Sequence, residues 1–377
     1  GFTLQYEMSY TNILNMLDLA GLPLRAADRG EGMPFVICGG PCAVNPEPLA
    51  PFVDAFLIGD GEESLPELLA IHLAWKDSGE DRDGFLRQLA GLEGCYVPKY
   101  YTPVYDADSG DFARMEIAPG APERIRRRIV KDFENAYFPT DIVVPYVASV
   151  HARVMLGVFR GCTRGCRFCQ AGFLYRPVRQ RSVATLKAQA LASMDATGYE
   201  ELSLTSLSTG DYQHLTELID ELLPECQARH VSMQLPSLRV DSFASKTAEQ
   251  LSGGRKASLT FAPEAGTQRL RDVINKGVNE EDLLRSVTDA FRNGWNSVKL
   301  YFMIGLPTET DEDLDGIVEL ANKVAKAYYD VPEEHRNKGL RIFVSASTFV
   351  LKPCTPFQLE LQYRVEEVRR KLLYSRG

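Results

Sequence analysis

Two hydrophobic periods alternate along the second half of the chain. Short apolar runs of strand length are each followed by a longer stretch in which apolar residues recur at helical spacing. The expected strands are Val154–Phe159, Glu201–Thr205, Val231–Leu235, Ser258–Phe261, Ser297–Phe302 and Arg341–Phe349. The amphipathic stretches that follow them include Val183–Ala196, Leu215–Ala228, Glu280–Asn293 and Asp311–Ala327.

Successive strand–helix units of this kind are joined by right-handed crossovers, which produce a parallel sheet with helices outside. Six units are too few to close an eight-stranded barrel, so residues 151–360 are expected to form a partial (β/α)6 barrel. In parallel α/β sheets, ligands bind at the carboxyl ends of the strands. The functional residues should therefore lie in the loops that follow the strands.

Residues 1–75 show the same order of strand, loop and helix on a smaller scale. Tyr10–Ala20 carries apolar residues at helical spacing, and Pro34–Cys38 and Ala55–Ile58 are short apolar strands that run into glycine-rich loops. A helix continues from the second loop to about Trp75. This order predicts an α/β domain with a doubly wound, Rossmann-like sheet.

The remaining segments are less regular. Prolines interrupt residues 76–150, which are expected to be an irregular connection between the two α/β domains. Residues 361–377 are expected to form a C-terminal helix from which a further domain could continue. The chain starts at Gly1 without a methionine, and we expect residues to be missing upstream.

Charge and composition narrow the classes of function. The chain has 377 residues, 45% of them hydrophobic, and a formal net charge of −9, so no global basic field would attract nucleic acid. A local basic cluster, either a solvated face or an RNA contact, comprises Arg124, Arg126, Arg127, Arg128 and Lys131. No apolar run reaches the roughly 18 residues of a membrane span, so no membrane partner is expected.

Three of the eight cysteines crowd into the loop after the first strand of the repeat. Cys162, Cys166 and Cys169 follow the spacing C-x3-C-x2-C. Clustered thiols without a visible secretory signal indicate metal ligation in a reducing compartment, so a cytoplasmic location is expected. Three thiolates can each bind one iron of a [4Fe–4S] cluster and leave the fourth iron open. A zinc site would need a fourth ligand, and the nearest histidine, His151, precedes the strand.

With Phe168 in its aromatic position, this loop resembles the C-x3-C-x-aromatic-C motif of the radical S-adenosylmethionine (SAM) superfamily. The resemblance covers about residues 151–360. It implies a [4Fe–4S] cluster on Cys162, Cys166 and Cys169, with the amino and carboxylate groups of SAM on the open iron. One-electron reduction would then cleave SAM to methionine and a 5′-deoxyadenosyl radical, while the protein orients the sulfonium and excludes water.

Loops at later strand ends extend the resemblance and add candidate SAM-binding residues to Phe168. Ser208, Thr209 and Gly210 end the second strand, where the superfamily places a glycine-containing loop near the methionyl amine. Ser237 lies in the loop after the third strand, two residues before Arg239.

Two charged residues and one glycine complete this set. Arg239 would pair with the SAM carboxylate, because its guanidinium fork suits that geometry. Glu264, in a segment that resembles G-x-E-S-G, would meet the ribose hydroxyls or a substrate donor. An ordinary strand-end ion pair remains an equal alternative for both residues. Gly305 begins G-L-P-T-E-T, which resembles methylthiotransferase-like and cobalamin-type members.

The N-terminal pattern resembles the second half of the cobalamin-binding domain found fused to radical SAM domains. Its glycines would let the backbone approach a large flat ligand, and they are Gly39, Gly40, Gly59 and Gly61. The cobalt-ligating D-x-H-x-x-G of that family is absent from these 377 residues, and His72 within a helix is expected to be structural. A degenerate fold that serves as a lid or substrate platform is therefore the alternative to cobalamin binding.

We expect the isolated cysteines to have structural roles. Cys38 and Cys42 are expected to be a buried pair rather than an auxiliary metal site, since two thiols cannot hold a cluster alone. Cys354, after the sixth strand, is expected to be a packed cysteine rather than a radical relay or thiol acceptor.

As a whole, the chain resembles the uncharacterised radical SAM proteins with a cobalamin-binding domain. The expected function is modification of a C–H position of an unknown substrate, small molecule, protein or RNA, with electrons from a flavodoxin- or ferredoxin-type donor. Methyl transfer is favoured if cobalamin binds. Methylthiolation comes second, because it needs a second cluster and the chain has no second cysteine triplet. A non-catalytic iron–sulfur protein or an RNA- or ribosome-binding module would be a function of another class.

Overall fold

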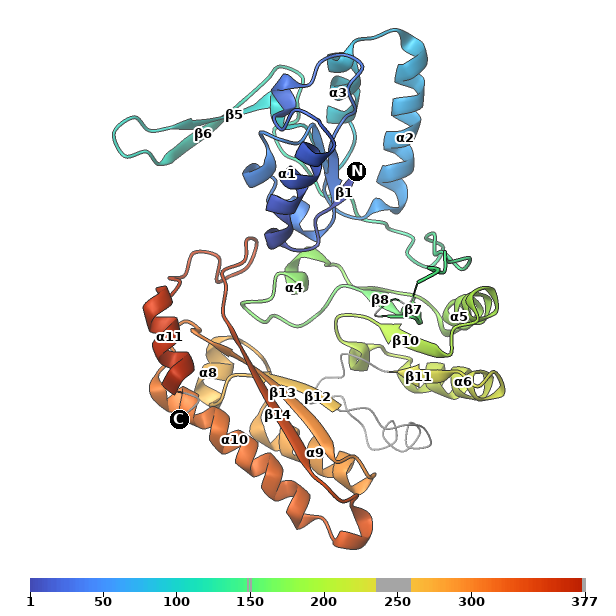
Figure 1. Cartoon of the computed structure of the whole chain (residues 1–377), viewed down its shortest axis with the longest axis vertical. Helices are drawn as coiled ribbons and strands as arrows, with labels where there is room; N and C mark the ends of the chain where they lie inside the picture. The colour runs from blue at the N-terminus through green and yellow to red at the C-terminus, as the bar shows by residue number, and fades with distance from the viewer. Residues whose placement is uncertain (148, 150, 235–258, 375–377) are drawn as a thin grey trace. The chain divides into compact units, whose positions relative to one another are not determined.

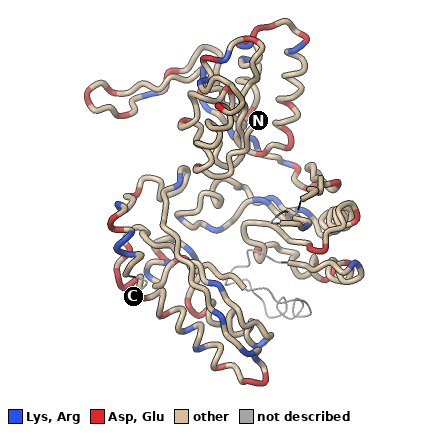
Figure 2. The backbone as a smooth tube through the Cα atoms, viewed as in Figure 1, with Lys and Arg blue, Asp and Glu red and all other residues tan. Residues whose placement is uncertain are grey.

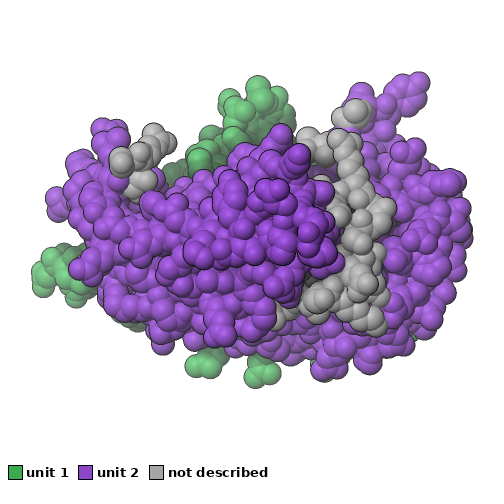
Figure 3. Space-filling view, turned by 90° about the horizontal axis from the view of Figure 1, so that it is seen from below, with its two compact units in different colours: residues 1–137 green, residues 138–377 purple. Residues whose placement is uncertain are grey.

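The chain divides into two units in the computed structural model, which describes residues 1–147, 149, 151–234 and 259–374. Unit 1 comprises residues 1–137 and unit 2 comprises residues 138–377 (Figure 3). The helices and strands of each unit are labelled in Figure 1. Within the described ranges, no helix combines the length and the apolar composition that crossing a membrane requires.

Unit 1 contains the doubly wound sheet that the sequence predicts. Its strands, in spatial order, are β1 (Phe2–Thr3), β2 (Ile37–Gly39), β3 (Ala55–Leu57) and β4 (Cys95–Tyr96). The first three strands are parallel, and β4 is antiparallel to β3. The helices are α1 (Tyr10–Leu19), α2 (Gly61–Ser78) and α3 (Arg82–Ala90).

Alternate residues of β3 pack against different helices of unit 1. Phe56 lies in a buried cluster with Ile13 of α1, whereas Leu57 lies in a second cluster with Leu68 of α2 and Phe85 of α3. Successive side chains of a strand point to opposite faces of its sheet. The helix α1 therefore covers one face, and α2 and α3 cover the other (Figure 1).

Unit 1 extends well beyond residue 75, into the range expected to be an irregular connection. The helix α3 packs on the sheet, β4 pairs with β3, and β5 (Tyr101–Tyr105) pairs with β6 (Phe112–Ile117) in an antiparallel hairpin. The prolines of this range do not prevent these elements, because Pro98 begins a 3₁₀ turn and Pro103 lies in a two-stranded hairpin. Residues 76–137 are thus part of the first domain.

Unit 2 contains the six strands expected for the partial barrel, described as two parallel three-stranded sheets. One sheet has the order β11 (Ser232–Gln234), β10 (Glu201–Thr205), β7 (Val154–Gly157), and the other has the order β12 (Leu259–Glu264), β13 (Ser297–Ile304), β14 (Arg341–Thr348). A small antiparallel pair joins β8 (Phe159–Arg160) and β9 (Arg179–Gln180). The helices are α4 (Ala171–Leu174), α5 (Val183–Thr197), α6 (Leu215–Ala228), α8 (Gln268–Val273), α9 (Glu280–Arg292), α10 (Asp311–Asp330) and α11 (Val365–Tyr374).

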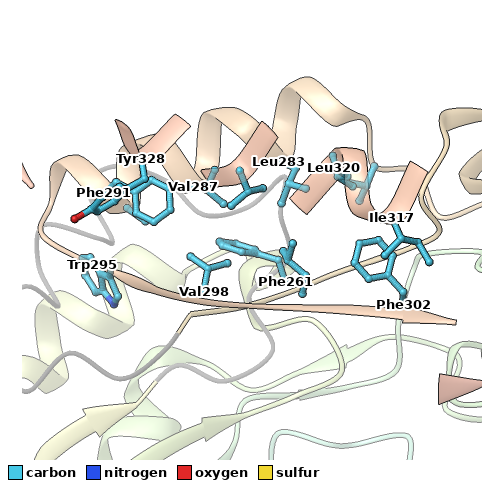
Figure 4. Packing of buried hydrophobic residues seen from close by; sticks show 14 of the residues in the cluster. Phe261, Leu283, Val287, Phe291, Trp295, Val298, Phe302, Ile317, Leu320 and Tyr328 are labelled. Atoms are coloured by element: carbon cyan, nitrogen blue, oxygen red, sulfur yellow. The ribbon is translucent and has the colours of Figure 1, made fainter. Parts of the chain in front are cut away.

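Strands β7, β10 and β13 each bury one face beneath helices. Val298 and Phe302 of β13 pack with Phe261 of β12 against Val287 of α9 and Leu320 of α10 (Figure 4). In the other sheet, alternate residues of β7 and β10 pack in the same way against α5 and α6. The intervening residues of these strands lie on the opposite face of each sheet.

The loops after β12 and β13 are locked together where α8 and α10 begin. A Cβ on Gly266 would lie 2.3 Å from the carbonyl oxygen of Asp313, so only glycine allows this close approach. The Asp313 carboxylate accepts hydrogen bonds from the Thr267 hydroxyl and from Arg269, and Arg269 also donates to the carbonyl oxygen of Thr308 at 2.9 Å. These contacts hold the G-L-P-T-E-T loop against the segment that contains Glu264.

A buried ion pair ties the C-terminal helix to the same loop. The Nζ of Lys371, on α11, lies 3.0 Å from Oε1 of Glu309, and the two side chains are 2% and 1% exposed. The backbone N–H of Gly305 also donates to the Glu309 carboxylate, at 2.9 Å and 3.1 Å. The glutamate of G-L-P-T-E-T therefore organises the loop and docks α11.

The substitution Lys371→Met should destabilise unit 2 strongly. Removing one partner of a buried ion pair leaves the other charge uncompensated, at a cost of about 3–5 kcal/mol. The double variant Glu309→Gln/Lys371→Met should lose less, because neither charge is then buried alone. The free energy of urea unfolding, measured for each variant, tests this.

Lys326→Met is the matched control, because Lys326 on α10 pairs with Asp330 at 2.6 Å but the two side chains are 74% and 60% exposed. That pair should contribute less than about 1 kcal/mol. Equal losses for Lys371→Met and Lys326→Met would contradict the assignment.

Candidate functional site

The three clustered cysteines lie in one loop, between β8 and α4. Gly161 opens this loop with a φ of +96°, and a Cβ there would lie 2.7 Å from the carbonyl oxygen of Tyr175. A side chain at this position would push the loop away from the segment that returns to β9. Glycine is therefore required where the strand turns into the cysteine loop.

Hydrogen bonds from surrounding segments hold the backbone of the cysteine loop. The Arg176 guanidinium donates to the carbonyl oxygens of Cys162, at 3.2 Å, and Arg164, at 2.7 Å. The Asn275 side chain donates to the carbonyl oxygen of Gly165 at 2.8 Å. These hydrogen bonds hold the cysteine loop by its backbone oxygens.

All three thiols line one cavity of about 370 Å³. Cys166 is buried, and Cys162 and Cys169 are partly buried. The other residues that line the cavity come from the strand ends and loops of both sheets, and they are Arg164, Phe168, Gly172, Leu207, Ser208, Thr260, Ala262, Glu264, Lys276 and Val278. The cavity thus lies where the parallel fold predicts a ligand site.

The donor set of this cavity fits an iron–sulfur cluster and a polar ligand. Burial raises the pKa of the Cys169 thiol, and the charges of the neighbouring Cys166 and Cys162 raise it further. Within the described residues, no three or more His, Cys, Asp or Glu side chains converge as the ligands of a single metal ion do. A cluster does not require such convergence, because each cysteine sulfur binds a different iron.

A buried hydroxyl in the cavity wall has no hydrogen-bond partner among the described residues. Ser208 is 2% exposed, and its Oγ is buried without a hydrogen bond in the described part of the chain. Leaving such a group unsatisfied is costly. A polar ligand in the cavity would supply the missing partner, as expected for Ser208 from the resemblance.

Glu264 lies in the cavity wall and forms an ion pair there. Its Oε1 lies 3.0 Å from Nζ of Lys276, and the two side chains are 16% and 11% exposed. Glu264 adopts a φ of +69°, a strained conformation for a residue with a side chain. The Lys276 Nζ also lies 5.8 Å from the ring centroid of Phe168. The Glu264 side chain thus forms an ion pair and also lies in the cavity wall, so the ion-pair and ligand interpretations of this residue are compatible.

Sequence reasoning missed Lys276 and the ion pair between Arg164 and Asp211. Arg164, inside the cysteine motif, donates to Asp211 from Nε at 3.0 Å and from Nη2 at 2.5 Å. This pair joins the cysteine loop to the 3₁₀ turn η6 (Thr209–Asp211) after β10. The sequence signal that could have indicated this ion pair is the opposite charge of two residues in the loops after successive strands. Lys276 follows the short helix α8, and no motif marks it.

The remaining SAM-site candidates are placed differently. Thr209 is buried in η6, and its hydroxyl is hydrogen-bonded with that of Ser206 at 2.9 Å. Gly210 follows it in the same turn and is partly buried. Gly305 does not line the cysteine cavity, and the Glu309 carboxylate holds its N–H. Ser237 and Arg239 lie outside the described residues.

In unit 1, the chain itself fills the space beside two of the four glycines. A Cβ on Gly40 would lie 3.0 Å from the backbone of Leu4, and one on Gly59 would lie 2.2 Å from the carbonyl oxygen of Arg128. Gly39 lies near the carbonyl oxygen of Leu57, and Gly61 has open space around it. Gly40 and Gly59 therefore permit close backbone packing within unit 1.

The other candidates of unit 1 have structural surroundings. His72 packs in an aromatic cluster with Phe35, Trp75 and Phe85. Cys38 and Cys42 are both buried. These positions agree with the structural roles expected for them.

The basic cluster around Arg128 is partly neutralised within unit 1. The Arg128 guanidinium lies 2.9 Å from Glu63, 2.7 Å from Glu67 and 3.5 Å from Glu93. Figure 2 shows Lys and Arg interspersed with Asp and Glu along both units. Arg128, one of the five basic residues of the cluster for which an RNA contact was the alternative to a solvated face, thus forms intramolecular ion pairs.

Cys354 lies in a loop attached to the cysteine loop, and it is exposed rather than packed. The Gln170 side chain donates to the carbonyl oxygen of Pro353 at 3.2 Å, and the N–H of Phe357 donates to the carbonyl oxygen of Arg167 at 3.3 Å. The expectation of a packed thiol was wrong, because this loop turns at Cys354 with a φ of +61°.

Family models match both units. Residues 1–98 match the model described as radical SAM proteins, N-terminal, and residues 156–321 match that of the radical SAM superfamily. The chain is 30% identical over 359 residues to the uncharacterized protein MJ0966 of Methanocaldococcus jannaschii, covering 95% of this chain and 67% of that protein. It is 22% identical over 310 residues to the uncharacterized methyltransferase PH0819 of Pyrococcus horikoshii, covering 77% of this chain and 58% of that protein.

Solved structures share the fold. The radical SAM methyltransferase TsrM of Kitasatospora setae, with cobalamin and a [4Fe–4S] cluster bound, matches 86% of this chain and 59% of its own, with a TM-score of 0.55 and 18% identity. The cobalamin-dependent SAM radical enzyme OxsB, with aqua-cobalamin and SAM bound, matches 96% of this chain and 50% of its own, with a TM-score of 0.56 and 14% identity. The chain spans half to two thirds of these proteins.

The cysteine loop lies at the head of a parallel α/β unit, both units match these family models, and one relative is 30% identical. The chain therefore belongs to the radical SAM superfamily.

Proposed function

We propose that the chain reductively cleaves SAM in the cavity lined by Cys162, Cys166 and Cys169. The observation that carries this proposal is that three thiols of one loop share a cavity with Ser208, Glu264 and Lys276. When bound, a [4Fe–4S] cluster supplies one electron that cleaves the sulfonium C–S bond of SAM, giving methionine and a 5′-deoxyadenosyl radical. A flavodoxin- or ferredoxin-type protein would deliver that electron.

The residues of the cavity have distinct roles in this proposal. Ser208 Oγ binds a polar group of SAM, since it has no other partner in the described ranges. Glu264 accepts hydrogen bonds from the ribose hydroxyls, while Lys276 holds its carboxylate in place. Phe168 and Leu207 form apolar parts of the wall, which help to exclude water.

The reaction that we favour is methyl transfer to a C–H position, with cobalamin as a second cofactor. Two observations support it: the similarity to PH0819, named a methyltransferase, and the shared fold with TsrM and OxsB. The chain's own backbone fills the space that a Cβ on Gly40 or Gly59 would occupy, and we derive no step through this group. Similarity over 173 residues to the putative methylthiotransferase MJ0865 of Methanocaldococcus jannaschii keeps methylthiolation as the second candidate.

Anaerobic reconstitution with iron and sulfide, followed by dithionite and SAM, should yield 5′-deoxyadenosine. Cys166→Ala should abolish its formation, because two thiolates cannot hold the cluster. Mass spectrometry of the product measures this. Cys354→Ser is the matched control, since Cys354 is exposed and does not line the cavity. A wild-type chain that assembles a cluster but forms no 5′-deoxyadenosine over hours would contradict the proposal.

Glu264→Gln should raise the KM for SAM by about tenfold or more, as expected when a hydrogen bond to a charged group is lost. The rate of 5′-deoxyadenosine formation against SAM concentration measures it, with iron content determined in parallel. Glu221→Gln is the control, because Glu221 also pairs with a lysine, Lys187 at 2.8 Å, but on the outer helices. An unchanged KM in Glu264→Gln would remove Glu264 from the SAM site.

A corrinoid should co-purify with the chain from a cobalamin-supplied host. Its visible absorption spectrum and mass spectrometry of the extract would identify it. The product formed with a substrate should then gain the mass of a methyl group. A chain that cleaves SAM but binds no corrinoid would exclude cobalamin-dependent methyl transfer, and a product that gains a methylthio group would favour the second candidate.

A further inference from the structure

An aromatic and cationic surface lies on the uncovered face of β13 and β14. Val298, Leu300 and Phe302 of β13 are buried beneath the helices, so the alternating residues Lys299 and Tyr301 point to the opposite face. Figure 4 shows Val298 and Phe302 on the helix side of this strand. In the described ranges, the helices that pack on this sheet contact the face of Val298, Leu300 and Phe302, which leaves the face of Lys299 and Tyr301 available to a ligand.

This surface continues the wall of the cysteine cavity. Thr260 of β12 lines that cavity and pairs in register with Lys299, which pairs in turn with Phe343 of β14. Neighbouring strands lie about 4.8 Å apart, so Thr260, Lys299 and Phe343 form a continuous row across three strands. A molecule in contact with Lys299 and Phe343 would lie one strand away from the cavity wall.

Lys299 has no carboxylate partner among the residues that the structure describes. The ion pairs of the described ranges involve other side chains. The Nζ of Lys299 instead lies 4.7 Å from the ring centroid of Tyr301. Lys299 is partly buried. A partly buried cation without an acidic partner favours an anionic ligand, because the ligand would supply the missing charge.

The aromatic rings on this face of β13 and β14 are exposed. Tyr301 is 36% exposed and Phe343 is 52% exposed, whereas Phe302 on the helix side of β13 is 1% exposed. Exposed apolar side chains that gather beside a cavity mark a binding surface. Planar rings bind such side chains by stacking or edge-to-face contact.

We propose that the molecule modified in this site carries a planar aromatic ring and an anionic group. The ring packs against Tyr301 and Phe343, and the anion binds Lys299. The proposal rests on the proposed function, since it names the substrate class of the same cavity. Aromatic carboxylates and nucleoside phosphates both combine a planar ring with an anionic group, and the binding test distinguishes between these two sources.

Binding of matched probes to the reconstituted chain with SAM tests this substrate class. The first pair is indole-3-acetate and indole-3-acetamide, and the second is uridine 5′-monophosphate and uridine. Ligand-observed NMR titration measures the Kd of each probe. The wild type should bind the anion of one pair at least about tenfold more tightly than its neutral partner, as expected for a charge-assisted hydrogen bond. The pair that shows the preference identifies the source.

Three variants assign the preference to the surface. Lys299→Gln should abolish it, and Lys299→Arg should retain it, because arginine keeps the cation. Tyr301→Leu should weaken both members of the pair alike. Lys323→Gln is the control, because Lys323 lies on α10 and pairs with Glu280 at 2.7 Å.

Two results would overturn the proposal: a wild type that does not distinguish either anion from its neutral partner, or a preference that survives in Lys299→Gln. The wild-type 5′-deoxyadenosine assay is independent of the probes. A chain that cleaves SAM without binding either anion refutes the substrate class alone, whereas a chain that does not cleave SAM refutes the proposed function.

Discussion

Burial of one face of each strand beneath helices is the constraint on which the rest of unit 2 depends. Val298, Leu300 and Phe302 must point towards α9 and α10 to be removed from water, and the period of the strand then forces Lys299 and Tyr301 to the other face. The same alternation places Thr260 in the wall of the cysteine cavity and Phe261 in the core. The site is thus a geometric consequence of how the core is packed.

The loops at the strand ends are organised largely by charge and by close backbone approach. Arg176 binds the backbone of the cysteine loop, Asp313 joins the loops after β12 and β13, and Glu309 bonds to Gly305 and Lys371. These interactions fix the positions of the strand-end loops of unit 2 relative to one another.

The glycines at strand ends permit close backbone packing in both units. Gly161 allows the cysteine loop to leave its strand beside the segment that returns to β9, and Gly40 and Gly59 allow the chain to pack against Leu4 and Arg128. At each of these positions a Cβ would meet the backbone of another segment. A glycine-rich strand end therefore does not by itself indicate a cofactor.

The sequence by itself determined the order of strands and helices in unit 2 and the position of the cysteine loop, because both are local patterns. The elements β10 and α6 begin and end where the hydrophobic periods change. The three thiols lie within eight residues. It did not reveal that β4 completes the first sheet, since β4 pairs with a strand 38 residues earlier at the Leu57–Cys95 register. Nor did it reveal the Lys276–Glu264 and Lys371–Glu309 pairs. Such partners are brought together only when the strands close into a sheet, so the tertiary structure alone decided which charges meet and which face of each strand stays open.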